Sequence, residues 1–118
     1  MKILVIDDDL DNLNMLREVL KRQHEVLTAT KGSDGLKVLS ENLDTHILIT
    51  DRQMPEMDGV QVIAWAKTIV PNIRACLMSG AMDDYSRMSA IRAGAERTLN
   101  KPFSVTELRE WVNGQKAP

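Results

Sequence analysis

The sequence predicts an α/β protein in which five parallel strands alternate with five helices, a (βα)5 chain. Two observations lead to this fold class. Short runs of Ile, Val and Leu recur along the chain, and strands that are apolar on both faces are typical of a parallel sheet covered by helices. Between these runs, apolar residues repeat every three or four positions, the spacing of an amphipathic helix. With 118 residues the chain is long enough for one such domain and too short for two.

The first half of the chain contains two predicted pairs of a strand and a helix. Ile3–Ile6 is a continuous run of β-branched residues and Leu, and the helix after it has Asp9 or Asp11 available as its N-cap. His24–Thr30 has the β-branched content of a second strand. A second helix is expected from Gly32 to about Asn42.

Three further pairs are predicted in the second half. The third helix stops before Pro71, because the residue before a proline disfavours the helical conformation. The fourth helix ends at Gly94, since glycine readily adopts the left-handed conformation that closes a helix. The expected elements are, in order, strand 46–50, helix 59–70, strand 75–78, a helix capped by Asp83 or Asp84, strand 97–100 and a helix capped by Ser104 or Thr106.

The composition excludes several classes of function. Hydrophobic residues make up 43% and charged residues 27%, the balance of an ordinary globular protein. The net charge of -2 provides no basic surface, so we expect no direct binding to nucleic acid by this segment. The longest apolar run is far shorter than a membrane span requires, and the acidic residues that follow the first strand argue against a signal peptide. We therefore expect no membrane binding and a cytoplasmic location.

Three residues that attract attention are assigned to packing. Cys76 is the one cysteine, so an internal disulfide is excluded, and its place in the apolar run Ile73–Met78 predicts a buried, unreactive thiol. Trp65 and Trp111 lie on apolar helix faces and are expected to be partly buried.

Charged and hydroxyl residues follow four of the five predicted strands. Right-handed crossovers place every carboxyl end at one edge of the sheet, so these side chains should meet there. Three crowded carboxylates repel one another, and a hard divalent cation such as Mg²⁺ makes such a cluster tolerable. The residues are Asp7 and Asp8 after the first strand, Asp51 after the third, Ser79 after the fourth and Lys101 after the fifth.

These residues suit the transfer of a phosphoryl group. A carboxylate such as Asp51 can attack phosphorus and form an aspartyl phosphate. The transferred group spreads its charge over three oxygens, so we expect one oxygen at the metal, one at the Lys101 ammonium and one at the Ser79 hydroxyl with nearby amides. Taken singly, each residue also has an ordinary explanation as a helix cap, a surface charge or part of a turn.

Four motifs carry a family resemblance. They are the pair Asp7-Asp8 after Ile3–Ile6, the segment Asp51-Arg-Gln-Met-Pro-Glu-Met-Asp-Gly59, Ser79 after Leu77-Met78, and Lys101-Pro-Phe103. Together they make the chain similar to the receiver domains of two-component response regulators. The match runs from about residue 2 to residue 113, so we expect a receiver domain over 1–113 and a tail or the start of a linker over 114–118. The family fold is the flavodoxin-like, doubly wound sheet with strand order 2-1-3-4-5.

The resemblance implies a phosphorylation-dependent signalling switch that catalyses only its own phosphorylation and dephosphorylation. Asp51 would receive the phosphoryl group from a sensor histidine kinase or a histidine phosphotransfer protein. An effector domain or a downstream protein would respond, and formation of a homodimer on phosphorylation is left open. The implied Mg²⁺ ligands are Asp7, Asp8, Asp51 and the backbone carbonyl of Gln53, and the residues implied to contact the phosphate are Lys101 and Ser79.

The sequence departs from the family at the position that usually transmits the signal. In the family, a hydroxyl residue and an aromatic on the fifth strand change the surface formed by that strand and its two flanking helices. Here Thr98 stands where the aromatic is expected, and Gly80 follows Ser79. We therefore expect switching to depend on movement of residues 79–84 and of the helix that follows.

Three other protein classes were weighed. A haloacid-dehalogenase-type phosphatase also forms an aspartyl phosphate, and Asp7 and Asp9 mimic its acidic pair, but that motif requires Thr or Val where Asp11 stands. A flavodoxin-like electron carrier requires a phosphate-binding loop after the first strand, where this chain has three acids. A degenerate receiver that acts only as a binding module is contradicted by the complete set of acids and Lys101.

Overall fold

Five strands alternate with five helices in the computed structural model, which describes residues 1–114. All strand pairs are parallel, in the order β2-β1-β3-β4-β5, so the predicted fold class and strand order are confirmed. Residues 115–118 of the predicted tail at 114–118 lie outside the described residues. The elements are β1 Lys2–Ile6, α1 Leu10–Leu20, β2 Glu25–Ala29, α2 Gly32–Ser40, β3 Ile47–Asp51, α3 Gly59–Ile69, β4 Arg74–Ser79, α4 Asp84–Ala93, β5 Arg97–Asn100 and α5 Val105–Val112.

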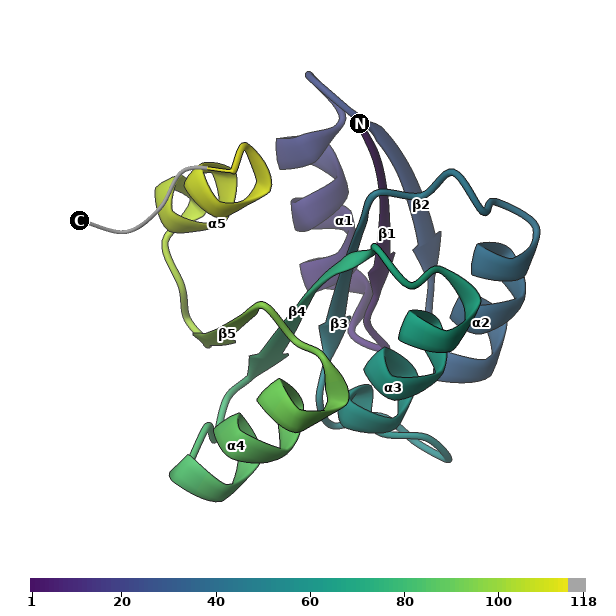
Figure 1. The fold of residues 1–118 in the computed structure, drawn as a ribbon. Coiled ribbons are helices and arrows are strands. Elements are labelled where there is room, and N and C mark those ends of the chain that lie inside the picture. The colour runs from purple at the N-terminus through teal and green to yellow at the C-terminus, as the bar shows by residue number, and fades with distance from the viewer. Residues whose placement is uncertain (115–118) are drawn as a thin grey trace.

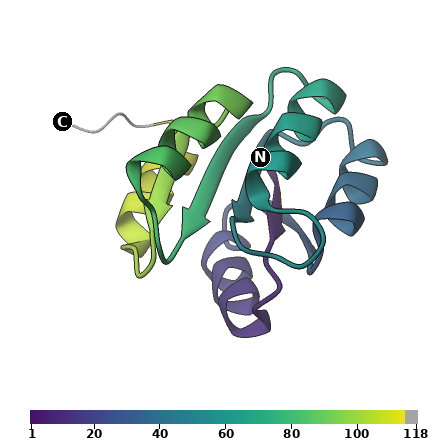
Figure 2. The same cartoon turned by 90° about the horizontal axis from the view of Figure 1, so that it is seen from below.

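The helices cover both faces of the sheet (Figure 1). Seen from below, α1 and α5 lie on one face and α2, α3 and α4 lie on the other (Figure 2). Within residues 1–114, every helix is too short or too polar to cross a membrane.

Each face of the sheet has its own hydrophobic core. Successive side chains of a strand point to opposite faces, so Ile3 and Val5 of β1 join the core under α1 and α5, whereas Leu4 and Ile6 join the core under α2, α3 and α4. All four are buried. This arrangement explains why Ile3–Ile6 of β1 are apolar at four successive positions. Cys76 is buried in the first of these cores, and burial raises the pKa of its thiol to about 12, as expected for an unreactive residue.

Side-chain caps fix where most helices begin. Of the alternatives left open by the sequence, Asp9 caps α1, Asp83 caps α4 and Ser104 caps α5, each by accepting hydrogen bonds from backbone amides of the first turn. Asp58 caps α3 and forms a reciprocal capping box with Gln61. These caps lie at the carboxyl edge of the sheet, so they also fix the loops that carry the charged residues.

The structure moves several of the predicted boundaries by one or two residues and corrects one of the predicted burials. β3 extends to Asp51, one residue further than predicted, because Asp51 still pairs with Met78 of β4. α2 ends at Ser40 rather than near Asn42. Trp111 is buried, but Trp65 is 59% exposed, because the buried side of α3 is occupied by the smaller residues Val62, Ile63 and Ala66.

A polar cluster formed by Arg74, Glu96, Trp111 and the Val112 carbonyl lies at the opposite, amino edge of the sheet. The Arg74 guanidinium donates to both Glu96 carboxylate oxygens and to the carbonyls of Trp111 and Val112, at 2.6 to 3.2 Å. The same guanidinium lies 4.8 Å from the Trp111 ring centroid, and the indole donates to Glu96 at 3.0 Å. The Arg74 cluster therefore ties the start of β4 to the residue before β5 and to the end of α5.

Candidate functional site

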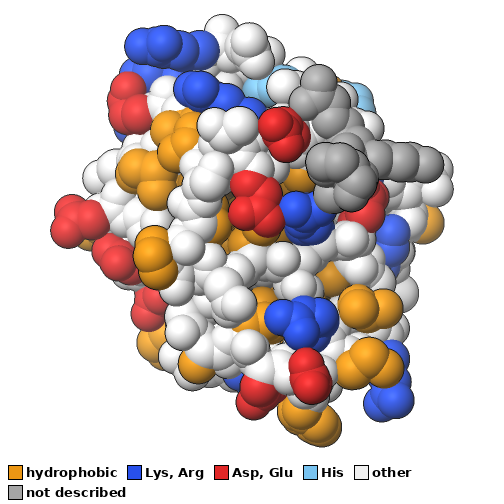
Figure 3. All heavy atoms as spheres, turned by 90° about the vertical axis from the view of Figure 1, so that its left-hand side faces the viewer, with side chains coloured by type: hydrophobic (Ala, Val, Ile, Leu, Met, Phe, Trp, Pro, Cys, Tyr) orange, Lys and Arg blue, Asp and Glu red, His pale blue; other side chains and the backbone are white. Residues whose placement is uncertain are grey.

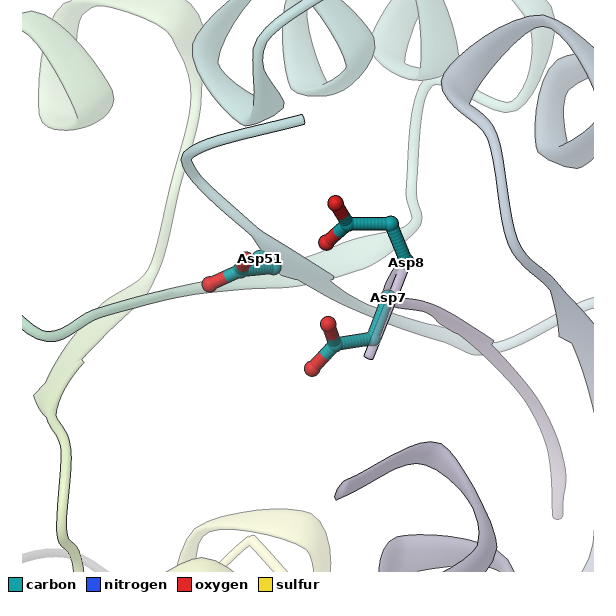
Figure 4. A group of neighbouring side chains, drawn as sticks. All are labelled: Asp7, Asp8 and Asp51. Atoms are coloured by element: carbon teal, nitrogen blue, oxygen red, sulfur yellow. The ribbon is translucent and has the colours of Figure 1, made fainter. Parts of the chain in front are cut away.

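Three acids from two neighbouring strands meet at the carboxyl edge of the sheet. Asp7 and Asp8 follow β1, and Asp51 ends β3. One carboxylate oxygen of each lies within 4.8 Å of the others, and Figure 4 shows the three side chains pointing in the same direction. Asp7 is fully buried and Asp51 is 8% exposed, whereas Asp8 is exposed. The cluster is thus closed toward the core and open toward solvent.

Asp7 is held by donors on both of its oxygens. Its Oδ1 accepts from the Asp9 amide at 3.0 Å. Its Oδ2 accepts from the side-chain amide of Asn12 and from Lys101 Nζ, the latter at 3.4 Å. These bonds replace the water that the buried carboxylate has lost. Asn12 was not predicted as a site residue, and the one available signal was its place in the first turn of a helix that starts at the site.

Lys101 joins two of the acids. Its Nζ lies 2.9 Å from Asp51 Oδ1 and 3.4 Å from Asp7 Oδ2. Burial by itself lowers the pKa of Lys101, but the hydrogen bonds and negative charges of Asp51 and Asp7 outweigh it and raise the pKa above its ordinary value. Lys101 is therefore an ammonium ion at neutral pH. Its backbone amide donates to the Ser79 carbonyl at 2.9 Å, which joins it to β4.

Asp51 is less acidic than an ordinary aspartate. Burial raises its pKa, and the charges of Asp7 and Asp8 act in the same direction, while the hydrogen bond from Lys101 partly offsets both. Burial first, and then the two neighbouring acids, thus disfavour the charged form of Asp51. A divalent cation would offset this effect, and a donor set made only of oxygens fits Mg²⁺.

Ser79 and Gln53 lie at the same edge. Ser79 is the last residue of β4 and is buried, and its hydroxyl oxygen accepts from the Ala81 amide at 3.1 Å, within its own loop. Gln53 lies two residues after Asp51, in a surface hollow that it lines together with Arg52, Met54, Pro55 and Asp58. Thr98 is partly buried on β5 and pairs in register with Leu77 of β4.

The loop between β3 and α3 fixes the backbone of Asp51. The Arg52 amide donates to the Met78 carbonyl at 2.8 Å, and the Gly59 amide donates to the Arg52 carbonyl at 2.9 Å. A Cβ atom on Gly59 would collide with the Asp51 carbonyl oxygen and lie 2.6 Å from Leu77 Cδ1. Only glycine fits there, which gives the last residue of the motif that begins at Asp51 a direct role in positioning that residue.

The sequence of the chain is similar to those of several known proteins. A family model described as "Response regulator receiver domain" matches residues 3–113. The "Transcriptional regulatory protein PrrA" of Mycobacterium tuberculosis is 34% identical over 108 residues, which cover 91% of this chain and 46% of that protein. The "Chemotaxis protein CheY1" of Helicobacter pylori strain 26695 is 31% identical over 117 residues, covering 93% of this chain and 92% of that protein. The chain thus spans about half the length of the transcriptional regulators that it matches and nearly all of the chemotaxis protein.

Solved structures show the same similarity. A response regulator receiver domain protein from Clostridium thermocellum superimposes with a TM-score of 0.90 at 32% identity, covering 96% of this chain and 91% of that one. The "BeF3 Activated DrrB Receiver Domain" gives a TM-score of 0.87 at 28% identity, with 96% and 94% of the two chains covered.

Proposed function

The chain belongs to the response regulator receiver domain family, and on that premise we propose that Asp51 accepts a phosphoryl group from a phosphohistidine. Receiver domains are phosphorylation-dependent signalling modules of two-component systems and act as switches rather than as classical enzymes. The observation that carries the assignment is the 2.9 Å contact between Lys101 Nζ and Asp51 Oδ1 beside two further acids from β1. A carboxylate with an ammonium group already beside it is prepared for attack on phosphorus.

The metal proposed for the reaction is Mg²⁺, held by Asp7, Asp8, Asp51 and the Gln53 carbonyl. Receiver domains bind Mg²⁺ in an acidic pocket, and the acid cluster of this chain offers suitable oxygens. When bound, the ion would neutralise part of the charge of the acids and of the incoming phosphoryl group.

The transfer itself exchanges one bond for another. A carboxylate oxygen of Asp51 forms a bond to phosphorus as the bond between phosphorus and the imidazole nitrogen breaks, and the bonding electrons stay with the imidazole of the donor. Lys101, kept as an ammonium, stabilises a second phosphoryl oxygen. The Ser79 hydroxyl still has its own proton to donate, because its oxygen acts as the acceptor toward Ala81. We assign that proton to the third oxygen.

The proposed switch follows from the position of Ser79. To reach phospho-Asp51 the Ser79 side chain has to rotate, and this rotation moves its oxygen away from the Ala81 amide, so residues 79–84 and the start of α4 rearrange. Thr98 provides no aromatic ring to follow this movement. A structure of the phosphorylated domain is expected to show a displaced β4–α4 loop, and an unchanged 79–84 segment would refute this route.

The partners belong to the same proposal. A sensor histidine kinase or histidine phosphotransfer protein would supply the phosphoryl group in the cytoplasm, and an effector domain or separate protein would read the surface formed by α4, β5 and α5. Hydrophobic side chains reach the surface on the side that carries these elements, among acidic and basic ones (Figure 3). The net charge of -2 favours a protein partner over direct contact with nucleic acid.

The decisive experiment is incubation with acetyl phosphate and Mg²⁺, followed by intact-mass spectrometry. The wild-type chain is expected to gain one phosphate, and Asp51→Asn is expected to gain none. Asp58→Asn is the matched control, because it makes the same change in the same loop at a residue that caps α3, and asparagine is an equally good cap. A phosphate retained by Asp51→Asn, or absent from the wild type, would contradict the assignment.

A further inference from the structure

Asn12 is the one neutral side chain among the groups that hold Asp7. It stands in the first turn of α1, and its side-chain amide donates to Asp7 Oδ2, the same oxygen that Lys101 Nζ approaches at 3.4 Å. Asp7 is fully buried while Asn12 is in place, and Asn12 is one of the two side chains that donate to this oxygen. The orientation of the Asp7 carboxylate therefore depends on Asn12 more than that of an exposed acid would.

The same contact affects Lys101. Its ammonium is shared between Asp51 at 2.9 Å and Asp7 at 3.4 Å, and the shorter bond is to Asp51. Because Asn12 supplies a donor to Asp7 Oδ2, this oxygen attracts the Lys101 ammonium less strongly. Without Asn12, the unpaired oxygen of Asp7 would attract the ammonium away from Asp51.

We propose that Asn12 is a positioning residue, which orients Asp7 for the metal and leaves Lys101 beside Asp51. This role rests on the proposed function of the site. Asn12 acts through Asp7 and makes no contact with the transferred group. Removal of a side chain that hydrogen-bonds to a metal ligand typically lowers the metal affinity 10-fold to 100-fold.

The surroundings of Asn12 make it a suitable residue to change. It is only partly buried, and it lines a surface hollow with Met15, Lys101, Pro102 and Phe103. Truncation of its side chain enlarges this open hollow and creates no closed cavity in the core. Asn14 lies exposed on the same helix and provides a matched control, since Asn→Ala at either position alters helix propensity in the same way.

The test measures binding of Mn²⁺, a paramagnetic substitute for Mg²⁺, by electron paramagnetic resonance. Asn12→Ala is expected to bind Mn²⁺ about tenfold more weakly than the wild type, and Asn14→Ala is expected to bind it equally well. Urea unfolding in EDTA then tests the contact without metal. Asn12→Ala should lower the midpoint more than Asn14→Ala does in the wild-type chain, and the two should be alike in an Asp7→Ala background, which has no side-chain acceptor for Asn12.

Each outcome has a distinct meaning. Wild-type affinity for Mn²⁺ in Asn12→Ala would overturn the proposal, as would an equal loss of stability in the wild-type and Asp7→Ala backgrounds, because Asn12 would then not act through Asp7. If the wild type takes up phosphate and Mn²⁺ while Asn12→Ala behaves identically, only this inference fails. If the wild type takes up neither, the proposed function fails and the role of Asn12 fails with it.

Discussion

At the scale of single residues, the groups of the proposed phosphorylation site already stand in place. Lys101 spans acids from two strands, with Asp51 at 2.9 Å and Asp7 at 3.4 Å. Its charge is maintained because both acids raise its pKa against the effect of burial. Groups that already stand in place need little rearrangement during the reaction, which is the main way in which a protein stabilises a transition state electrostatically.

Gly59 supports this arrangement from the backbone, which leads to a mutational prediction. Gly59→Ala introduces a Cβ that collides with the Asp51 carbonyl oxygen, so the strand end must move. We expect a loss of unfolding free energy of about 1–3 kcal/mol, the usual cost of overpacking, together with slower phosphorylation. Urea denaturation and the acetyl phosphate assay measure the two effects.

The control for this variant is Gly80→Ala, in the neighbouring β4–α4 loop. A Cβ on Gly80 meets nothing within 4 Å, so its unfolding free energy should stay within about 0.5 kcal/mol of the wild type. If the two variants were equally stable, the close approach of Gly59 to Asp51 would not be a constraint on this fold.

The positions of some single residues could be predicted from the sequence, and those of others could not. The acids and Lys101 could be predicted, because each directly follows a strand and parallel strands end at one edge. Asn12 could not be, since its contact with Asp7 depends on how α1 is rotated about its axis. Trp65 was wrongly expected to be partly buried, because its spacing from Val62 does not show that smaller residues fill the interface.

At the scale of elements, the Arg74 cluster attaches α5 to the sheet. α5 is short, and its last carbonyls have few partners within the helix. Arg74 donates to two of them, those of Trp111 and Val112; the Gly114 amide also donates to the Trp111 carbonyl. Glu96 balances the charge of Arg74 and accepts from the Trp111 indole. The sequence did not reveal this cluster, because its members lie 15 to 38 residues apart.

Glu96 makes the attachment of α5 sensitive to pH. The hydrogen bond from Arg74 lowers the pKa of Glu96 below its ordinary value of 4.5. A group with a lowered pKa contributes stability above its ordinary pKa and loses it as the pH falls through the folded value. We expect the wild type to be more stable than Glu96→Gln by about 0.5 kcal/mol at pH 7, a small amount because the carboxylate is half exposed.

This difference should shrink as the pH falls below the ordinary pKa of 4.5 and disappear below the lowered pKa of the folded state, where Glu96 is protonated in both states. Urea denaturation at a series of pH values measures it. Glu110 is an exposed acid on α5. The unfolding free energy of Glu110→Gln should match that of the wild type at every pH. A Glu96→Gln variant that kept the same deficit at low pH would show that the contact does not depend on charge.

At the scale of the whole molecule, the acid cluster links stability to metal. Only the folded chain brings Asp7, Asp8 and Asp51 together, so bound Mg²⁺ should raise the melting temperature. At a concentration about ten times the dissociation constant, the gain is about 1.4 kcal/mol, or about 5 °C for a domain of this size. Calorimetry with Mg²⁺ or EDTA measures it.

Asp51→Asn separates metal binding from folding. The variant should show a smaller Mg²⁺ shift but no loss of stability in EDTA, because it removes a buried carboxylate whose pKa is raised by burial and by its acidic neighbours. A clear loss of stability in EDTA would indicate that Asp51 serves the fold rather than the chemistry. No shift in the wild type with either Mg²⁺ or Mn²⁺ would count against the metal site.

The overall fold could be predicted because its signals are local and repeated. Apolar runs such as Ile3–Ile6 and Ile47–Ile49 identify covered strands, and the alternation with helices requires a parallel sheet. The exact ends of elements were less certain. The extension of β3 to Asp51 depends on pairing with Met78, a contact between strands that local composition does not encode.

The Arg74 cluster has a mechanical consequence for the switch. It clamps β4, β5 and α5 together at the amino edge, whereas Ser79 and the β4–α4 loop lie at the far end of the same strand, at the carboxyl edge. β4 is paired with β3 and β5 up to its carboxyl end, so movement caused by the proposed phosphorylation is expected in the β4–α4 loop beyond Ser79 rather than in the strand. The Arg74 cluster thus holds β4, β5 and α5 together at the amino edge of the sheet, the edge farthest from the proposed phosphorylation site.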